Sequence, residues 1–187
     1  MSRRVPWPLL VAVALGAAIA FAISRIDFGE AIREVTLPLR HEDTIRQQAE
    51  RFNLDPALIA AVIYEESRFR DQTSDAGARG LMQITPDTAD TIEQLSGGKT
   101  FEYDDLADSD LNIRYGTYYL DHLLNQYGGN VVAALAAYNG GPTNVNEWGG
   151  TELDLDDIRF AETRTYVEHV LERREQYLDS YAGDLGL

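Results

Sequence analysis

The sequence predicts a predominantly helical, all-α fold, and three observations lead to this prediction. Apolar residues recur every three or four positions in several segments, a spacing that places them on one face of a helix. Two of these segments open with a capping residue followed by proline, Asp55–Pro56 and Thr85–Pro86, which is a strong helix start signal. No run of alternating polar and apolar residues indicates a β-sheet. We therefore expect one helical domain without internal repeats.

The first two helices of this domain are expected over residues 41–53 and 55–67. In the first, Ile45, Ala49 and Phe52 have helical spacing. The second, "LDPALIAAVIYEES", is almost wholly apolar until it reaches two adjacent glutamates.

Four more helices are expected over residues 85–98, 108–129, 130–142 and 160–183. The helix over 130–142 is short and nearly all apolar, so we predict that it is buried at the centre. Residues 149–158 are interpreted as an acidic loop. The expected apolar side of the helix over 108–129 consists of Leu111, Tyr115, Tyr118, Leu123 and Tyr127. The final helix is expected to present Tyr166, Val170, Tyr177 and Tyr181.

The N-terminus is typical of an exported protein. Arg3 and Arg4 precede an uncharged, mostly apolar stretch over residues 5–23. This stretch approaches the length of about 20 residues that spans a bilayer, which favours an uncleaved membrane anchor. Small residues near its end leave a cleaved signal peptide, and hence a secreted protein, as the alternative. We therefore predict an anchor or signal peptide over residues 1–25, a linker over 26–40 and the helical domain over 41–183.

Composition excludes several classes of function. The formal net charge of −15 argues against a nucleic-acid partner, because nothing here would neutralise a phosphate backbone. The chain has no cysteine, which excludes disulfides, thiolate metal sites and cysteine nucleophiles. Its histidines, His41, His122 and His169, are far apart in sequence, and we expect neither a metal site nor a cofactor.

Two adjacent carboxylates, Glu65 and Glu66, end the apolar helix over residues 55–67. Helical spacing puts Glu66 on the face of Ile59 and Ile63, beside the bulkier apolar groups. Desolvation and the negative end of the helix dipole both favour a neutral carboxyl there, as a general acid requires. Spacing alone also allows an ordinary helix-end glutamate that reaches into solvent.

Four ordered motifs weigh against the solvent-exposed interpretation: "ESRF" with "GARGLMQITPDTA", then "NIRYGTYYL", "AAYNGGP" and "AETRTYV". With them, the chain resembles the soluble lytic transglycosylase family, whose members are lysozyme-like, related to goose-type lysozyme, and cut peptidoglycan glycan strands. The resemblance covers about residues 40–180. It implies a lysozyme-like helical catalytic domain with a substrate cleft, and a membrane-anchored location facing the cell wall or periplasm.

The resemblance also assigns roles to individual positions. It implies that Glu66 is the single catalytic residue, that Glu65 is structural or peripheral, and that Tyr138 donates a hydrogen bond near Glu66. The substrate-binding residues that it implies are Ser67, Ser74, Met82, Gln83, Tyr138, Asn139, Glu162 and Tyr166. Where Gly140 stands the family usually has alanine, and we expect this loss of a methyl group to loosen the turn. Where Thr85 stands it commonly has methionine, so an apolar sugar contact is expected to be missing.

The activity that the resemblance implies is cleavage of the β-1,4 bond between N-acetylmuramic acid and N-acetylglucosamine, with formation of 1,6-anhydromuramic ends. The expected partners are thus peptidoglycan glycan strands, together with the membrane through the N-terminal segment. Two alternatives remain: a hydrolytic muramidase with a second acid among Asp71, Asp75 and Glu162, and a non-catalytic peptidoglycan-binding domain.

Overall fold

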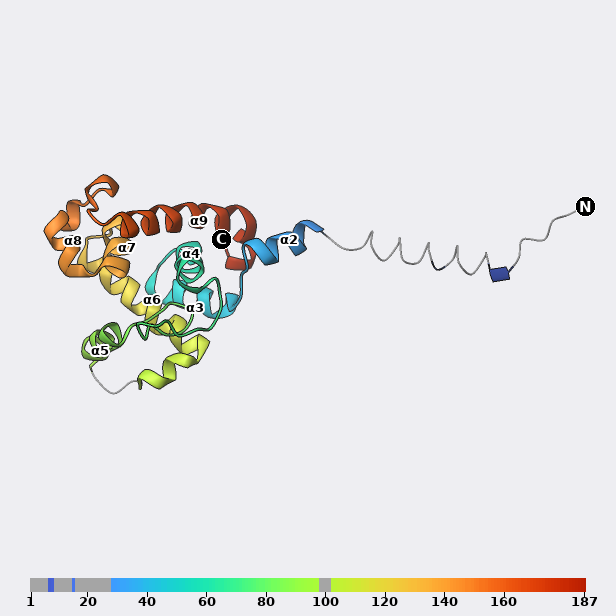
Figure 1. The fold of residues 1–187 in the computed structure, drawn as a ribbon, viewed down its shortest axis with the longest axis horizontal. Helices are drawn as coiled ribbons and strands as arrows, with labels where there is room; N and C mark the ends of the chain where they lie inside the picture. The colour runs from blue at the N-terminus through green and yellow to red at the C-terminus, as the bar shows by residue number, and fades with distance from the viewer. Residues whose placement is uncertain (1–6, 9–14, 16–27, 98–101) are drawn as a thin grey trace, which may run out of the picture. The chain divides into compact units, whose positions relative to one another are not determined.

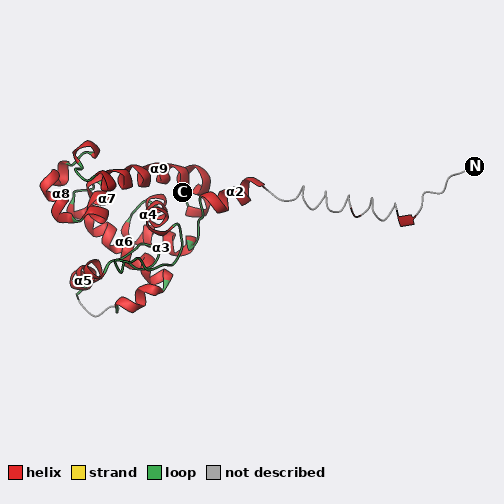
Figure 2. Cartoon of the chain, in the orientation of Figure 1, coloured by secondary structure: helices red, strands yellow, loops and turns green. Residues whose placement is uncertain are grey.

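The computed structural model describes residues 7–8, 15, 28–97 and 102–187 (Figure 1). The described part is built of helices, turns and loops and contains no strand, which confirms the predicted all-α class (Figure 2). The expected export segment lies almost entirely outside the described residues. Among the helices that are described, none has the length and apolar character needed to cross a bilayer.

The chain divides into two compact units, Met1–Pro38 and Leu39–Leu187. The first contains helix α2 (Phe28–Thr36), which lies within the segment expected to be a linker. The second contains the remaining elements described below. Its α-helices are α3 (Glu42–Phe52), α4 (Pro56–Ser67), α5 (Pro86–Leu95), α6 (Ser109–Gln126), α7 (Val131–Gly140), α8 (Pro142–Trp148) and α9 (Ala161–Leu185). Its 3₁₀ helices are η1 (Tyr103–Ala107), η2 (Gly150–Glu152) and η3 (Leu155–Asp157).

These elements agree with the predicted order of helices, with two differences. Pro142 was expected only to end the preceding helix, but it occupies the first turn of a separate helix, α8. Proline suits that position because the amide hydrogen that it lacks has no helical partner there. The expected acidic loop contains two short 3₁₀ helices, η2 and η3.

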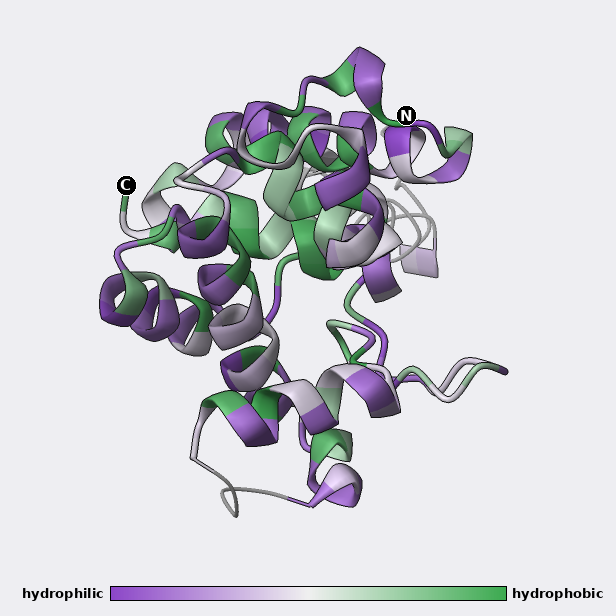
Figure 3. Cartoon of the chain, turned by 90° about the vertical axis from the view of Figure 1, so that its left-hand side faces the viewer, coloured by the Kyte–Doolittle hydropathy of each residue, from purple (hydrophilic) through white to green (hydrophobic). Residues whose placement is uncertain are grey.

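Helix α4 forms the centre of the second unit. Asp55 caps it by accepting a hydrogen bond from the backbone N–H of Ala57, and every residue from Pro56 to Tyr64 is buried. The helix packs mainly against α9. Apolar residues concentrate in the inner helices, and polar residues dominate the periphery (Figure 3). Because α4 is enclosed on all sides, its last turn delivers the two glutamates to a partly enclosed position.

The buried face of α6 differs from the predicted one. Leu111, Tyr115 and Tyr118 are partly exposed, whereas the residues that face the core are Asn112, Ile113, Gly116, Thr117, Tyr119, Leu120, Leu123 and Leu124. The prediction followed the largest apolar side chains, but the helix makes its close contact through its smallest residue. Gly116 lies directly against the buried side chain of Met82.

The loop between α4 and α5 is fastened to α6 by the buried side chain of Asn112. Its amide nitrogen donates hydrogen bonds to the carbonyl groups of Arg79 (2.9 Å) and Leu106 (3.1 Å). Its side-chain oxygen accepts one from the backbone N–H of Met82 (2.8 Å). Two isolated β-bridges, Thr73 to Arg79 and Arg79 to Ile84, fold the loop on itself. The segment that precedes α5 is thereby held next to the end of α4.

Replacing Gly116 with alanine is expected to lower the free energy of unfolding by about 1–3 kcal/mol. The added Cβ would lie 2.7 Å from Met82 Cβ and closer still to its sulfur, so the helix and the loop must move apart. Urea unfolding followed by circular dichroism measures the change. Gly183→Ala is the matched control, because a Cβ there meets no atom within 4 Å, and its stability should stay within about 1 kcal/mol of wild type. Equal stability of Gly116→Ala and wild type would contradict the close packing.

Candidate active site

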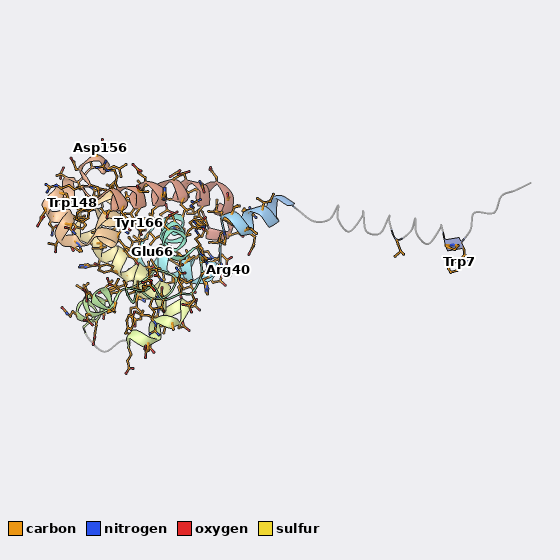
Figure 4. All side chains as sticks on the ribbon, in the orientation of Figure 1. Trp7, Arg40, Glu66, Trp148, Asp156 and Tyr166 are labelled. Atoms are coloured by element: carbon orange, nitrogen blue, oxygen red, sulfur yellow. The ribbon has the colours of Figure 1, made fainter. Side chains whose placement is uncertain are left out.

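Glu66 lies in the last turn of α4, immediately before the chain leaves the helix through Arg68 in a left-handed conformation. The phenol of Tyr166, on α9, donates a hydrogen bond of 2.8 Å to Glu66 Oε1. Figure 4 shows these two labelled side chains beside each other, one from each helix. Burial raises the pKa of Glu66 from 4.5 to about 7; the Tyr166 hydrogen bond lowers this pKa and the neighbouring charge of Glu65 raises it. A carboxyl group with this pKa can both hold and release a proton near neutrality.

Glu65 has a different environment from its neighbour. Its carboxylate lies 3.3 Å from Arg173 Nε and 3.6 Å from His169 Nδ1, both on α9. The Arg173 guanidinium also stacks 4.2 Å from the centre of the Tyr64 ring. Glu65 is thus the ion-paired member of the two glutamates, while the hydrogen-bond partner of Glu66 is an uncharged phenol.

Tyr166, His169 and Arg173 lie on one face of α9, because they are three and four residues apart. Together they contact both glutamates at the end of α4. Burial and the nearby Glu66 charge raise the pKa of the Tyr166 phenol well above 10, so it remains a hydrogen-bond donor at neutral pH. The packing of α9 on α4 therefore sets the protonation and orientation of Glu66.

A cavity of about 420 Å³ opens beside Glu66. Six of the sequence-predicted site residues line it: Glu66, Ser74, Gln83, Tyr138, Asn139 and Glu162. They come from the end of α4, the loop before α5, the end of α7 and the start of α9. The fold thus brings together residues that are nearly a hundred positions apart in sequence.

Three predicted substrate-binding residues, Ser67, Met82 and Tyr166, lie outside this lining. Tyr166 contacts Glu66 directly, and the other two face the core. Ser67 is buried, and its hydroxyl lies 2.7 Å from the carbonyl oxygen of Leu81, joining α4 to the loop before α5. Met82 is fully buried against Gly116. Both side chains face the core, so they support the cavity wall without reaching its surface.

The phenol of Tyr138 also differs from the expectation. It donates its hydrogen bond to the carbonyl oxygen of Met82 (2.9 Å), whereas the phenol that binds Glu66 belongs to Tyr166. The phenol that contacts the Glu66 carboxylate is therefore Tyr166, and the expected contact from Tyr138 is not formed. Tyr138 instead packs its ring against Tyr119, with ring centres 5.7 Å apart.

Gly140 allows α7 and α9 to approach each other closely. A Cβ at this position would lie 2.9 Å from the hydroxyl oxygen of Thr163. That hydroxyl donates a hydrogen bond of 2.9 Å to the side-chain oxygen of Asn139, which lines the cavity. The missing methyl group thus makes room for a side chain that orients Asn139, and the expected loosening of the turn stays a prediction.

Sequence reasoning missed six residues that also line the cavity: Ala76, Ala78, Ile84, Thr85, Thr88 and Tyr119. Tyr119 is part of the quoted "NIRYGTYYL" motif, but the helical spacing of large residues predicted that its neighbours, and not Tyr119, form the apolar side of this helix. Thr85 was expected to cap a helix, and it does so by accepting a hydrogen bond from the backbone N–H of Thr88. It was otherwise noted only as a position where an apolar sugar contact of the family is missing. Small residues and caps carry no sequence signal that separates a cavity wall from an ordinary turn.

The arrangement supplies acid–base chemistry through carboxyl and phenol groups. The three candidate second acids, Asp71, Asp75 and Glu162, are all exposed, and of them Glu162 alone lines the cavity. Within the described ranges, no group of three or more potential ligand residues is placed to hold a metal ion.

Comparison with known proteins identifies relatives of the chain. The model of the transglycosylase SLT domain matches residues 43–160. A soluble lytic murein transglycosylase of Escherichia coli K12 is 32% identical over 160 residues, which is 81% of this chain and 25% of the relative. Membrane-bound lytic murein transglycosylase C of Edwardsiella ictaluri is 36% identical over 116 residues, 57% of this chain and 32% of the relative.

A solved structure shares the fold as well. The X-ray structure of lytic transglycosylase Slt from Pseudomonas aeruginosa, described as an inactive glutamate-to-glutamine mutant, matches with a TM-score of 0.72 and 34% identity. The match covers 79% of this chain and 25% of that one. The chain thus spans about a quarter to a third of the length of these relatives.

The burial of Glu66 predicts that stability falls with rising pH. Between its pKa of 4.5 in the unfolded chain and about 7 in the folded one, only the folded state holds the proton. The free energy of unfolding therefore decreases through this window. Glu66→Gln removes the cost of burying a charged carboxylate. We therefore expect its free energy of unfolding at pH 8 to exceed that of wild type by up to about 3 kcal/mol. The advantage should shrink toward pH 5.

Urea titrations at the two pH values measure this difference. Glu65→Gln is the control, because it removes one partner of the ion pair to Arg173 and should give no gain at pH 8. A difference between Glu66→Gln and wild type that is independent of pH would show that Glu66 titrates as an ordinary carboxyl group.

Proposed function

The chain belongs to the transglycosylase SLT domain family, and from this premise we propose that it is a peptidoglycan lytic transglycosylase that uses Glu66 as its single catalytic residue. The helical, lysozyme-like fold expected from the sequence is shared with the Pseudomonas aeruginosa enzyme. One observation carries the proposal: a carboxyl group with a pKa of about 7 borders a cavity and accepts a hydrogen bond from a protonated phenol. The inactive glutamate-to-glutamine mutant of that relative supports a glutamate-dependent mechanism.

The proposed reaction uses the Glu66 carboxyl group twice. Protonated Glu66 gives its proton to the glycosidic oxygen between N-acetylmuramic acid and N-acetylglucosamine, and the bond from this oxygen to the anomeric carbon breaks. The acetamido group of the substrate stabilises the oxocarbenium-like centre. The Glu66 carboxylate then takes the proton from the 6-hydroxyl group, whose oxygen bonds to the anomeric carbon. The product is a 1,6-anhydro sugar, and no water is consumed.

The surroundings of Glu66 suit both steps. Partial burial makes the neutral acid available near pH 7, and the Tyr166 phenol stabilises the carboxylate that forms after proton transfer. Intramolecular attack by the 6-hydroxyl group benefits from proximity, so no second residue has to activate water. We propose that Ser74, Gln83, Tyr138, Asn139 and Glu162, which line the cavity, contact the glycan strand.

A hydrolytic muramidase remains the second candidate, and the position of Glu162 favours it. This carboxylate lines the same cavity as Glu66, and two-carboxylate glycosidases place their second acid across such a cavity. The two reactions differ in their products, because hydrolysis leaves reducing ends and transglycosylation leaves anhydro ends.

We propose further that residues 41–183 form the catalytic domain and that residues 1–25 hold it at the membrane, facing the cell wall or periplasm. Arg3 and Arg4 before the uncharged stretch support this location. Recovery of the intact N-terminus from the membrane fraction supports an anchor, and its loss from the mature protein supports the alternative of a secreted form.

Glu66→Gln is expected to lower glycan cleavage by at least about 10³-fold, because the amide cannot donate the required proton. Mass spectrometry of the muropeptides released from purified peptidoglycan measures both the rate and the ends. Wild type should release 1,6-anhydro products, and Glu162→Gln should release the same products within about tenfold of the wild-type rate. Reducing ends, lost in Glu162→Gln, would establish the hydrolytic reaction instead.

Tyr166→Phe is expected to shift the basic limb of the pH–rate profile to higher pH, because it removes the hydrogen bond that lowers the pKa of Glu66. The rate near neutrality should also fall, by about 10–100-fold, since the carboxylate loses its orienting donor. Tyr138→Phe is the matched control: its hydroxyl binds the carbonyl group of Met82, so the basic limb should stay in place. A shift in Tyr138→Phe alone would reverse the two assignments.

A further inference from the structure

A second groove lies where α3, the end of α5 and α6 meet, and we call it the arginine groove. It consists of two adjoining cavities of about 460 and 400 Å³, both lined by Arg51 and Arg114. The first is completed by Gln47, Gln48 and Glu50, and the second by Phe52, Leu95, Ser96, Tyr115 and Tyr118. The groove shares no lining residue with the cavity at Glu66.

One half of the groove is aromatic. The rings of Phe52 and Tyr118 are 6.0 Å apart and tilted, and both remain partly accessible to solvent. Leu95 adds an exposed apolar side chain. The Arg51 guanidinium is held 5.2 Å from the centre of the Phe52 ring, which favours a fixed position for its charge. This half offers an apolar surface with a cation at its edge.

The charge of the groove is opposite to that of the chain. The whole chain has a net charge of −15, but the groove has two arginines and the single carboxylate of Glu50. Arg46, Arg79, Arg173 and Arg174 form ion pairs with carboxylates. Across the ranges that the structure describes, neither Arg51 nor Arg114 has a carboxylate within ion-pair distance. Their guanidinium groups are thus available to bind a carboxylate ligand.

The other half of the groove contains an acceptor without a donor. The side chain of Gln48 is almost completely buried, and its Oε1 is without a hydrogen-bond partner in the described part of the chain. A buried polar atom of this kind is uncommon and indicates a missing partner. A ligand that carries both N–H donors and carboxylates therefore matches the amide and the two arginines together.

We propose that the arginine groove binds the acidic stem peptide of peptidoglycan and is a second substrate-binding site. This inference rests on the proposed function, in which peptidoglycan is the polymeric substrate. In that polymer the lactyl carboxyl group of muramic acid is consumed in the amide bond to the peptide, so the free carboxylates lie on the peptide stems. Amide N–H groups accompany them, and an apolar side-chain methyl group fits the aromatic half of the groove.

The proposed site separates recognition of the peptide from cleavage of the glycan. Helix α6 contributes Tyr119 to the cavity at Glu66, but Tyr115 and Tyr118 to the arginine groove. A strand that carries stems would be held at both places, whereas a strand stripped of its peptides would be held at the cavity alone. The groove should therefore affect the KM for stem-bearing strands and leave kcat unchanged.

The test uses the full-length chain with Arg51→Gln and Arg114→Gln combined. Calorimetric titration with free stem peptide, released from peptidoglycan by an amidase, should show binding to wild type that weakens with salt and is at least about tenfold weaker in the double variant. The matched control is Arg40→Gln with Arg159→Gln, which removes the same charge from exposed positions outside the groove. This control should bind the stem peptide as wild type does.

Turnover provides the second measurement. The groove variant should show a KM raised about three- to tenfold on stem-bearing strands, with unchanged kcat, and wild-type kinetics on strands stripped of peptide. Equal binding of the stem peptide by wild type and the groove variant would overturn the proposal. Equal loss of binding in the control, or displacement of the peptide by inorganic phosphate at equal concentration, would also overturn it, since the groove would then recognise charge alone.

Failure of the proposed function gives a different result. If wild type cleaves neither type of strand but binds the stem peptide through the two arginines, the chain is a peptidoglycan-binding protein and the groove proposal stands. If both strands are cleaved but the peptide does not bind, the groove proposal fails and the enzyme proposal stands.

Discussion

The hydrogen bond between Tyr166 and Glu66 is the interaction on which the site depends, because it joins α4 and α9 at the only place where the buried helix presents an acid to the cavity. The two residues are 100 positions apart in sequence, so the bond exists only when the second unit is fully folded. Desolvation pushes the Glu66 carboxyl toward its neutral form, and the phenol limits that effect. The pKa of about 7 is the balance of this hydrogen bond, which lowers it, against desolvation and the nearby charge of Glu65, which raise it.

The two adjacent glutamates show how one helix face divides structural and chemical roles. Glu65 forms an ion pair with Arg173 and lies 3.6 Å from His169, so its carboxylate fastens α9 to α4. In the described structure no cationic side chain forms an ion pair with Glu66, and its pKa of about 7 lets it titrate near neutrality. A helix end with a single glutamate would have to combine fastening and acid–base chemistry. An arginine next to the Glu66 carboxylate would lower its pKa and favour the ionised form over the neutral acid.

Much of the fold was predictable because its signals are local. Asp55 with Pro56 and Thr85 with Pro86 mark helix starts, and both caps form as expected. The buried face of α6 was not predictable, because the close contact between Gly116 and Met82 depends on a loop distant in sequence. Helical spacing favoured Glu66 over Glu65 only modestly, and the motif "ESRF" fixed the choice, since α4 is buried all round and offers little contrast between its faces. The exchange of roles between Tyr138 and Tyr166 has the same cause: sequence motifs place both phenols near the acid, but only the packing of α9 decides which one reaches it.

Asn112 has a consequence for how a strand would enter the cavity. Its buried amide already binds the backbone of the loop before α5 through Arg79 and Met82, and Gln83, which lines the cavity, directly follows Met82. This wall is therefore preorganised, and the proposed binding of a saccharide would cost little conformational entropy on that side. Flexibility in such a complex would reside in the sugar polymer, so affinity should depend more on the stiffness of the glycan than on any adjustment of the protein.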